Sequence, residues 1–381
     1  MGIRSITKLK KVEEKKQTEK FVRNVIIGND IFALNSLYEI RKKTEEVILY
    51  TDKEFDFNAI ELKGPSQLRG DVNIEYFKVA LKKEEVSISN GEPQFFKDLK
   101  FRKFGGRSKP EPIQWGEDFY QNQYANIDLD EIFPLEKIKE NFNELLNSVT
   151  VAQVIKVKRI LTEDMIENAK WYVEFSSGEQ VRCENLIWNL NVDQFFSKIE
   201  NKDSLSSEFI QYCDQTRTPS TLNITFEMDG ELTEKRETLF IPLSYTHEWG
   251  HFICEFGEYN EEKNKQTAKF VLFVDKSQTS EEELARKIRL LKRNIEKIFP
   301  KFKKISYKEY IVLSDFSPCL KIDDSLAKNF LLEDNNLSFV GFNAPLVDQV
   351  SQEGLFGDSL FGLSHLARAH ASTCLMLENF Q

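Results

Sequence analysis

The pattern of apolar and polar residues between positions 22 and 52 predicts a strand, a tight turn, a helix and a second strand. The apolar run VII ends at Gly28, and apolar residues then recur at helical spacing over 31–40. The run 47–50 is again β-branched and aromatic. Two buried parallel strands joined by a helix form the opening unit of a dinucleotide-binding fold, so the pattern predicts an α/β, Rossmann-like protein.

The turn after the first strand keeps only part of the phosphate-binding pattern. Dinucleotide-binding turns use three glycines as G-x-G-x-x-G, but here Gly28 is followed by Asp30 and Ala33 at the second and third positions. Ala33 still permits close packing of helix and strand, whereas Asp30 adds a negative charge where a pyrophosphate would approach. The acidic residue that binds ribose is expected about 20 residues further on. Thr51 occupies that place, with Asp52 beside it.

Later patterns predict a second domain that is inserted into the first. Residues 134–147 form an amphipathic pattern, and 220–275 holds four strand-like runs separated by polar turns, typical of an antiparallel sheet. Thr279 and Glu282 then stand in capping-box positions before another amphipathic pattern. The predicted organisation is a flexible lead-in at 1–20, a dinucleotide-binding domain made of 21–60, 148–195 and 330–381, and an antiparallel substrate-type domain made of 61–147 and 196–329.

Composition narrows the class of protein. The chain has 381 residues and 31 phenylalanines, which favours a bulky aromatic interior and an apolar pocket. A net charge of −10 argues against general nucleic-acid binding. The five cysteines form no C-x-x-C pair, so we expect reduced thiols and a cytoplasmic location. No apolar stretch is long enough to predict a transmembrane segment.

The order of these parts resembles the flavin-dependent amine oxidase and protoporphyrinogen oxidase superfamily. VIIGNDIFAL is similar to its FAD-binding opening, VIKVKRI and CENLIWNL to its mid-chain return, PSTLNITFEM to its substrate-domain sheet, and LSFVGFNAP to its closing segment. The resemblance implies FAD as cofactor. The positions that it assigns to the cofactor are Gly28, Asp30, Ala33, Thr51, Asp52, Ile155, Gly341 and Phe342.

The departures from the family pattern fall at the cofactor positions. Asp30, Ala33 and Thr51 replace family residues that contact FAD, and Phe342 stands where the family has an aspartate. We therefore predict an amine-oxidase-like protein with a degraded FAD site, non-catalytic or weakly flavin-binding, that binds a partner or a small apolar ligand. The alternative is a working FAD-dependent oxidoreductase, in which Asp30 turns away and Asp52 serves as the ribose acid.

A third hypothesis comes from the segment HEWGH at 247–251. On a helix, His247 and His251 would share a face as zinc ligands, with Glu248 as the general base of a hydrolase. Pro242 stands where such a helix would begin. The flanking runs instead favour strands, which would make the segment a hairpin turn.

The two remaining histidines, His365 and His370, fall on the last predicted helix. They are five residues apart, so they do not share a helix face. The sequence assigns no catalytic residue, substrate or oligomeric state.

Overall fold

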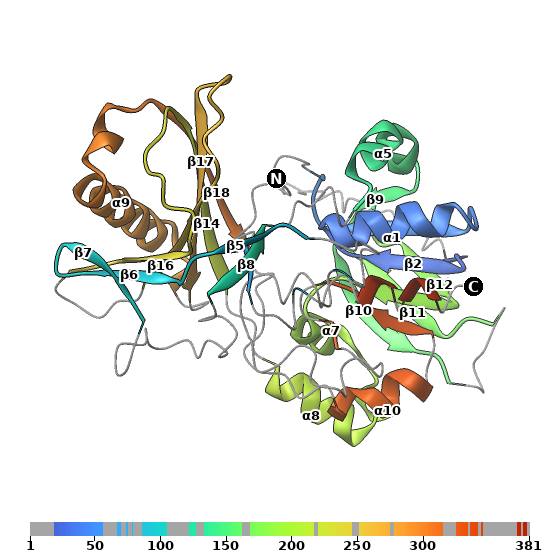
Figure 1. Ribbon diagram of the computed structural model, residues 1–381. Helices are drawn as coiled ribbons and strands as arrows, with labels where there is room; N and C mark the ends of the chain where they lie inside the picture. The colour runs from blue at the N-terminus through green and yellow to red at the C-terminus, as the bar shows by residue number, and fades with distance from the viewer. Residues whose placement is uncertain are drawn as a thin grey trace, which may run out of the picture.

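In the part of the chain that it describes, the computed structural model contains four β-sheets, and helices cover faces of the two largest (Figure 1). Among the residues that it describes, no helix is long and apolar enough to cross a membrane. The described residues are 19–55, 67–69, 86–104, 122–126, 133–161, 168–216, 220–245, 251–274, 278–314, 325–333 and 336–341, with short pieces at 74, 78, 344–345, 372–374 and 376–378.

A five-stranded parallel sheet forms the centre of the dinucleotide-type part. The strands are short, and all but the edge strand 149–151 are largely buried, as expected where both faces of a parallel sheet are covered. Segments far apart in the chain meet here, which confirms the predicted mid-chain and C-terminal returns. The strand order is β19 (Leu337–Phe339), β13 (Asn185–Trp188), β2 (Asn24–Ile27), β3 (Val47–Thr51) and β9 (Val149–Val151).

Both faces of this sheet are covered, because successive residues of β2 point to opposite sides. Ile26 packs with helix α1 (Ile31–Arg41). Val25 and Ile27 point to the opposite face and pack with the elements that cover it. Figure 1 shows α1 and α5 on one side and α7, α8 and α10 on the other. The remaining covering elements are α5 (Leu135–Glu140), α6 (Phe142–Leu146), α7 (Val192–Lys198), η3 (Lys202–Ser204), α8 (Ser207–Gln215), α10 (Ser325–Glu333) and a sheet of β1 (Glu19–Phe21), β12 (Gln180–Cys183), β11 (Trp171–Phe175) and β10 (Val154–Arg159).

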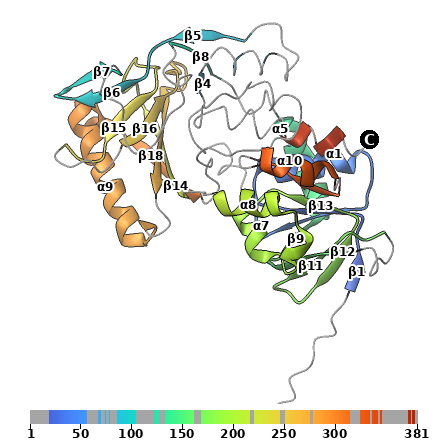
Figure 2. The same ribbon diagram turned by 90° about the horizontal axis from the view of Figure 1, so that it is seen from below.

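A seven-stranded sheet forms the other large part of the molecule. Neighbouring strands are antiparallel except for β15 and β6, which run parallel. Helix α9 (Glu281–Ile298) and η5 (Pro300–Lys304) cover one face, as Figure 2 shows for α9. The order is β18 (Tyr307–Ser314), β14 (Ser220–Asp229), β17 (Lys265–Val274), β16 (His251–Phe256), β15 (Leu239–Pro242), β6 (Gln94–Lys97) and β7 (Lys100–Lys103).

Several predicted boundaries need correction. The helix expected over 134–147 is interrupted at Asn141, where α5 ends and α6 begins. Helix α9 is capped by Ser280, whose hydroxyl accepts from the amide of Glu283, so the cap is one residue later than predicted. The sheet expected to be antiparallel is mixed, through its β15–β6 pair. The division into an inserted domain stays a prediction.

A buried polar network joins the seven-stranded sheet to a small sheet of β4 (Gln67–Arg69), β8 (Gln123–Asn126) and β5 (Ile88–Asn90). Arg69 is 4% exposed and donates to the hydroxyl of Thr238, the side chain of Gln67 and the carbonyl of Gly91. Glu255 on β16 accepts from the Gln67 amide. Burial lowers the pKa of Arg69 to about 10, and the charge of Glu255 opposes that shift, so Arg69 stays charged near neutral pH.

Candidate functional site

The carboxyl ends of β19, β13, β2 and β3 meet at one edge of the parallel sheet, where ligands bind in open α/β folds. Gly28 follows β2, Asn189 follows β13, and Gly341 lies just beyond β19. The sheet ladder continues past the strand ends, because the Gly28 amide donates to Tyr50 and the Asn189 amide to Ile27. These residues are therefore held firmly at the predicted site.

Asp30 occupies the N-terminus of α1 with its own side chain. Its Oδ1 accepts hydrogen bonds from the backbone amides of Phe32, at 2.8 Å, and Ala33, at 3.2 Å. Free amides at a helix N-terminus, together with the helix dipole, form the usual anion-binding position in such folds. Asp30 is 3% exposed, so its carboxylate places a negative charge in the position where a phosphate would bind.

Asn189 fills the space between the two glycines. A Cβ added to Gly28 would lie 2.4 Å from Asn189 Oδ1, and one added to Gly341 would lie 2.8 Å from Asn189 Nδ2. Gly341 also has a φ of +106°, which an L side chain rarely adopts. The Asn189 side chain donates to the carbonyl of Val340, while its Oδ1 is buried and has no hydrogen-bond partner among the described residues.

The end of β3 carries the position expected for a ribose acid. Thr51 is buried and its hydroxyl donates to the carbonyl of Lys53, so it faces its own turn. Asp52 is exposed and accepts from Asn29 Nδ2 at 2.9 Å. This hydrogen bond connects Asp52 to the glycine turn through Asn29, the residue before Asp30.

Comparisons with known proteins were made on sequence and on structure. No protein-family description and no curated protein matches the sequence. Putrescine oxidase matches the structure over 96% of this chain and 100% of its own, with a TM-score of 0.53 and 10% identity. Cyclohexylamine oxidase from Brevibacterium oxydans IH-35A matches over 94% and 99%, with a TM-score of 0.54 and 8% identity.

An oxidoreductase from Methanosarcina mazei matches equally broadly, over 93% of this chain and 100% of its own, with a TM-score of 0.53 and 12% identity. The chain has the flavin amine oxidase fold. The resemblance read from the sequence is thereby confirmed for the fold. Identities this low carry neither the cofactor nor the activity with them.

Within the flavin amine oxidase fold, the glycine turn of this chain does not fit a pyrophosphate in its present arrangement. A phosphate on the α1 amides would meet the carboxylate of Asp30, which already accepts from two of them. The alternative in which Asp30 turns away from the helix is not the arrangement observed. Asn189 also leaves no room for a second group between Gly28 and Gly341.

The structure says less about Ile155 and Phe342, the other two residues predicted to contact the cofactor. Ile155 lies on β10 at an irregularity in the pairing with β11, and its side chain is 49% exposed. Phe342 lies outside the described residues, as do His365 and His370. A role for any of these residues in binding stays a prediction.

The helix proposed for HEWGH is wrong at both ends that the structure describes. Pro242 ends strand β15 instead of beginning a helix, and His251 begins strand β16, directly paired with Pro242. His247 and Glu248 lie outside the described residues. Among the residues described, no group of three histidine, cysteine or acidic side chains is arranged to hold a metal ion. Zinc is therefore not supported, and the strand interpretation of the flanks is confirmed.

The face of the seven-stranded sheet opposite α9 carries an aromatic cluster. Phe95, Phe240 and Ile253 are buried there, and Phe104 and Phe273 pack against them partly buried. We call these five residues the aromatic face. The ring of His251 lies 6.4 Å from that of Phe240.

His251 is a polar residue beside the aromatic face. Its Nδ1 is buried without a hydrogen-bond partner among the described residues. Burial lowers the pKa of its imidazole below 6.5, so the ring is neutral at pH 7. A neutral, unpartnered imidazole nitrogen beside apolar rings can hydrogen-bond a ligand.

Sequence reasoning missed two residues at the glycine turn. Asn29 and Asn189 have no role in the sequence prediction, although Asn189 directly follows the buried strand β13 and Asn29 stands two residues after β2. A polar side chain at the carboxyl end of a parallel strand is a usable signal, because those ends converge on one edge. The sequence contains no comparable signal for the direction in which the Asp30 side chain points.

Proposed function

We propose that this protein uses the flavin amine oxidase fold to bind a small apolar ligand, and that it does not hold FAD as a working cofactor. The observation that carries the proposal is the Asp30 carboxylate on the α1 amides. Flavin enzymes hold their cofactor rigidly against the substrate, and a repelled pyrophosphate removes the main anchor for that geometry. Asn189, packed between Gly28 and Gly341, supports the same conclusion.

The aromatic face supports the binding part of the proposal. Phe104 and Phe273 are its partly exposed rings, and His251 adds a buried imidazole nitrogen without a hydrogen-bond partner among the described residues. A few polar groups among apolar side chains are the usual composition of small-molecule sites. A ligand with an apolar or aromatic body and one polar group would suit this surface.

The direct test is an absorption spectrum of protein that has been purified, incubated with FAD and desalted, with zinc quantified on the same sample. We expect no flavin band and no stoichiometric zinc. A retained flavin band would overturn the proposal and favour an oxidoreductase, for which oxygen consumption with amines is the next measurement.

Opening the glycine turn should raise the affinity for FAD. In Asp30→Gly with Ala33→Gly, the carboxylate and the methyl group are both removed, so the α1 amides become available to a phosphate. We expect at least a fivefold gain in FAD affinity by fluorescence quenching, since the repelled charge alone contributes on the order of 1 kcal/mol. Asp30→Asn is the control, because asparagine caps a helix nearly as well without the charge.

This control divides the effect of charge from that of space. If Asp30→Asn gains as much FAD affinity as the double glycine variant, the charge of Asp30 is what prevents FAD binding. If only the double glycine variant gains affinity, the space that the side chains occupy prevents it. Equal, weak FAD affinity in all three proteins would contradict the role given to Asp30.

Binding at the aromatic face can be measured with Nile red, a neutral fluorescent probe. Phe104 and Phe273 are only partly buried, so replacing both by serine should weaken probe binding at least fivefold without unfolding the protein. Val151→Ser with Leu161→Ser, at two exposed apolar positions outside the seven-stranded sheet, is the matched control. Equal binding by all three proteins would remove the aromatic face from the proposal.

A further inference from the structure

One end of the seven-stranded sheet is basic, although the protein has a net charge of −10. The hairpin region 94–104 holds four basic residues and one acidic residue, and the segment 297–304 holds four basic residues and none that is acidic. We call their exposed basic side chains the basic end: Lys97, Lys100, Arg102, Lys103, Lys297, Lys301, Lys303 and Lys304.

The two segments of the basic end belong to one surface. The ring centroids of Phe101, on β7, and Phe299, just before η5, are 5.9 Å apart. Both views show β6, β7 and α9 together on the side of the molecule away from α1 and the parallel sheet (Figures 1 and 2). The basic end is therefore remote from the glycine turn.

The tip of the β6–β7 hairpin has an unusual conformation for its residues. Lys97 pairs with Lys100, so Asp98 and Leu99 form a two-residue turn with φ values of +51° and +61°. Turns with two positive φ values prefer Asn-Gly or Asp-Gly, because a leucine is disfavoured in the left-handed region. Leu99 is nonetheless 89% exposed to water. An apolar side chain is thus presented at the tip at a cost to stability.

The charges around the tip leave two lysines free. Arg102 pairs with Asp98 at 2.7 Å, and Lys103 pairs with Glu92 at 2.9 Å. Lys97 and Lys100 form no ion pair with the residues that the structure describes. The two-residue turn that carries Leu99 therefore lies between two lysines that form no ion pair with the described residues.

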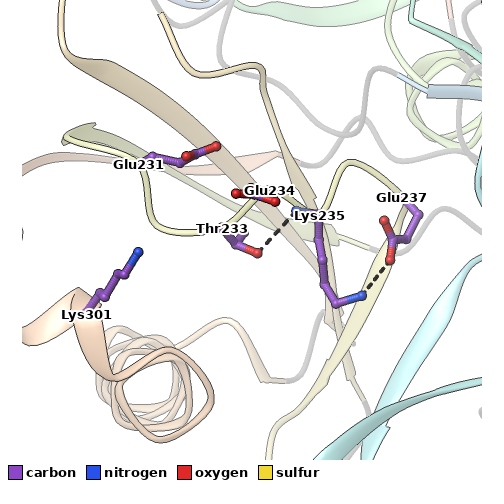
Figure 3. Close-up of a pocket in the computed structure, with 6 residues that line it drawn as sticks. All are labelled: Glu231, Thr233, Glu234, Lys235, Glu237 and Lys301. Carbon is purple, nitrogen blue, oxygen red and sulfur yellow. Dashed lines mark hydrogen bonds and ion pairs between the residues drawn. The ribbon is translucent and has the colours of Figure 1, made fainter. Parts of the chain in front are cut away.

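A shallow hollow of about 430 Å³ lies beside η5 and contains three glutamates (Figure 3). Glu237 pairs with Lys235 at 2.8 Å, and Glu231 pairs with Arg236 at 2.9 Å. Two of the three carboxylates are thus neutralised within the protein. Lys301 lies across the hollow from them in Figure 3. Three members of the basic end form ion pairs, Lys303 with Glu296 besides the two at the hairpin, and the other five form none with the residues that the structure describes.

We propose that the basic end docks this protein onto a membrane surface that contains anionic lipids, with Leu99 inserted at the headgroup boundary. An apolar side chain combined with several lysines provides the two signals that stable peripheral binding needs. A nucleic acid also attracts lysines through its phosphates, but it offers no apolar layer for an exposed leucine. The acidic remainder of the protein is repelled by the same surface, which sets the orientation.

The test is sedimentation of the full chain with vesicles of phosphatidylcholine, with or without phosphatidylserine. We expect binding only when phosphatidylserine is present, weakening as salt is raised, because charge attraction at a membrane is screened. The outcome is independent of flavin binding, so it does not depend on the proposed function. Failure to bind either vesicle, or equal binding to both, would overturn the proposal.

Two variants examine the tip itself. Lys97→Glu with Lys100→Glu should weaken vesicle binding at least tenfold, since each lysine near an anionic surface contributes about fivefold. Leu99→Asn should weaken it about tenfold by removing the inserted side chain. Asparagine tolerates a positive φ, so this variant should melt at the same or a higher temperature than the original protein.

The control is Lys158→Glu with Lys263→Glu, which makes the same charge change at exposed positions on β10 and in the β16–β17 turn. It should bind vesicles within about twofold of the original protein, because these lysines lie outside the basic end. Equal losses in the control and in the tip variant would overturn the assignment to the hairpin. Binding to double-stranded DNA as tight as to vesicles, and insensitive to Leu99→Asn, would replace the membrane by a nucleic acid.

Discussion

Replacing Arg69 by methionine is expected to destabilise the protein by about 3–5 kcal/mol, the usual cost of removing one partner from a buried charged pair. The guanidinium is almost fully buried and donates to Thr238, Gln67 and Gly91. Its loss removes a positive charge from beside Glu255, which is 5% exposed. Urea unfolding followed by circular dichroism would measure the change in the free energy of unfolding.

The partner substitution provides the control for this prediction. Arg69→Met combined with Glu255→Gln should recover a large part of the lost stability, because the buried negative charge is then also removed. Arg69→Lys should lie between the two, since an ammonium keeps the charge but not the fork of donors. If Arg69→Met costs less than about 1 kcal/mol, the network does not hold the small sheet to the seven-stranded sheet.

Replacing Gly28 by alanine is the second large change, with an expected cost of about 3 kcal/mol. The added Cβ would lie 2.4 Å from Asn189 Oδ1 and 2.7 Å from Ala33 Cβ, and both neighbours are buried. The interior is close-packed there, so the strand or the helix must shift. A lower urea midpoint with an unchanged slope would be the expected result.

Rescue by a second substitution tests the cause of that loss. Asn189→Gly removes both Asn189 atoms that a Cβ at position 28 would approach, so Gly28→Ala with Asn189→Gly should regain part of the stability. Asn189→Ala keeps its Cβ, 2.6 Å from the added methyl group, and should rescue less. Additive losses in both double variants would show that the Asn189 contact is not the source of the effect.

Arg69 and Gly28 both act through contacts with residues that are distant in the sequence. Such contacts cannot be predicted from short stretches of sequence, whereas local elements can. The unit β2–α1–β3 is local: an apolar run, a glycine and helical spacing suffice to indicate it. The strands β14 to β18 of the seven-stranded sheet were also recognisable from their apolar patterns, whereas β6 and β7 fall in a region that the sequence did not predict as strands. The parallel pairing of β15 with β6 was not, because Leu239 and Gln94 meet only through the tertiary fold.

The HEWGH segment shows how a motif depends on its context. The same residues fit a zinc-binding helix or a hairpin, and both patterns are locally consistent. Pairing of His251 with Pro242 across two strands decides between them in the part that the structure describes. Strand pairing joins residues outside the motif, so the five residues of the motif do not contain the information, although the flanking runs favour strands.

The sequence by itself determined the α/β class, the dinucleotide-type opening and the loss of two glycines at the phosphate turn. These follow from composition and short-range periodicity. Only the tertiary structure decided that Asp30 points back onto the α1 amides, that Asn189 fills the space between Gly28 and Gly341, and that Leu99 stands exposed among lysines. The physical reason is that a side chain's direction and burial depend on neighbours that the fold, and not the chain order, brings beside it.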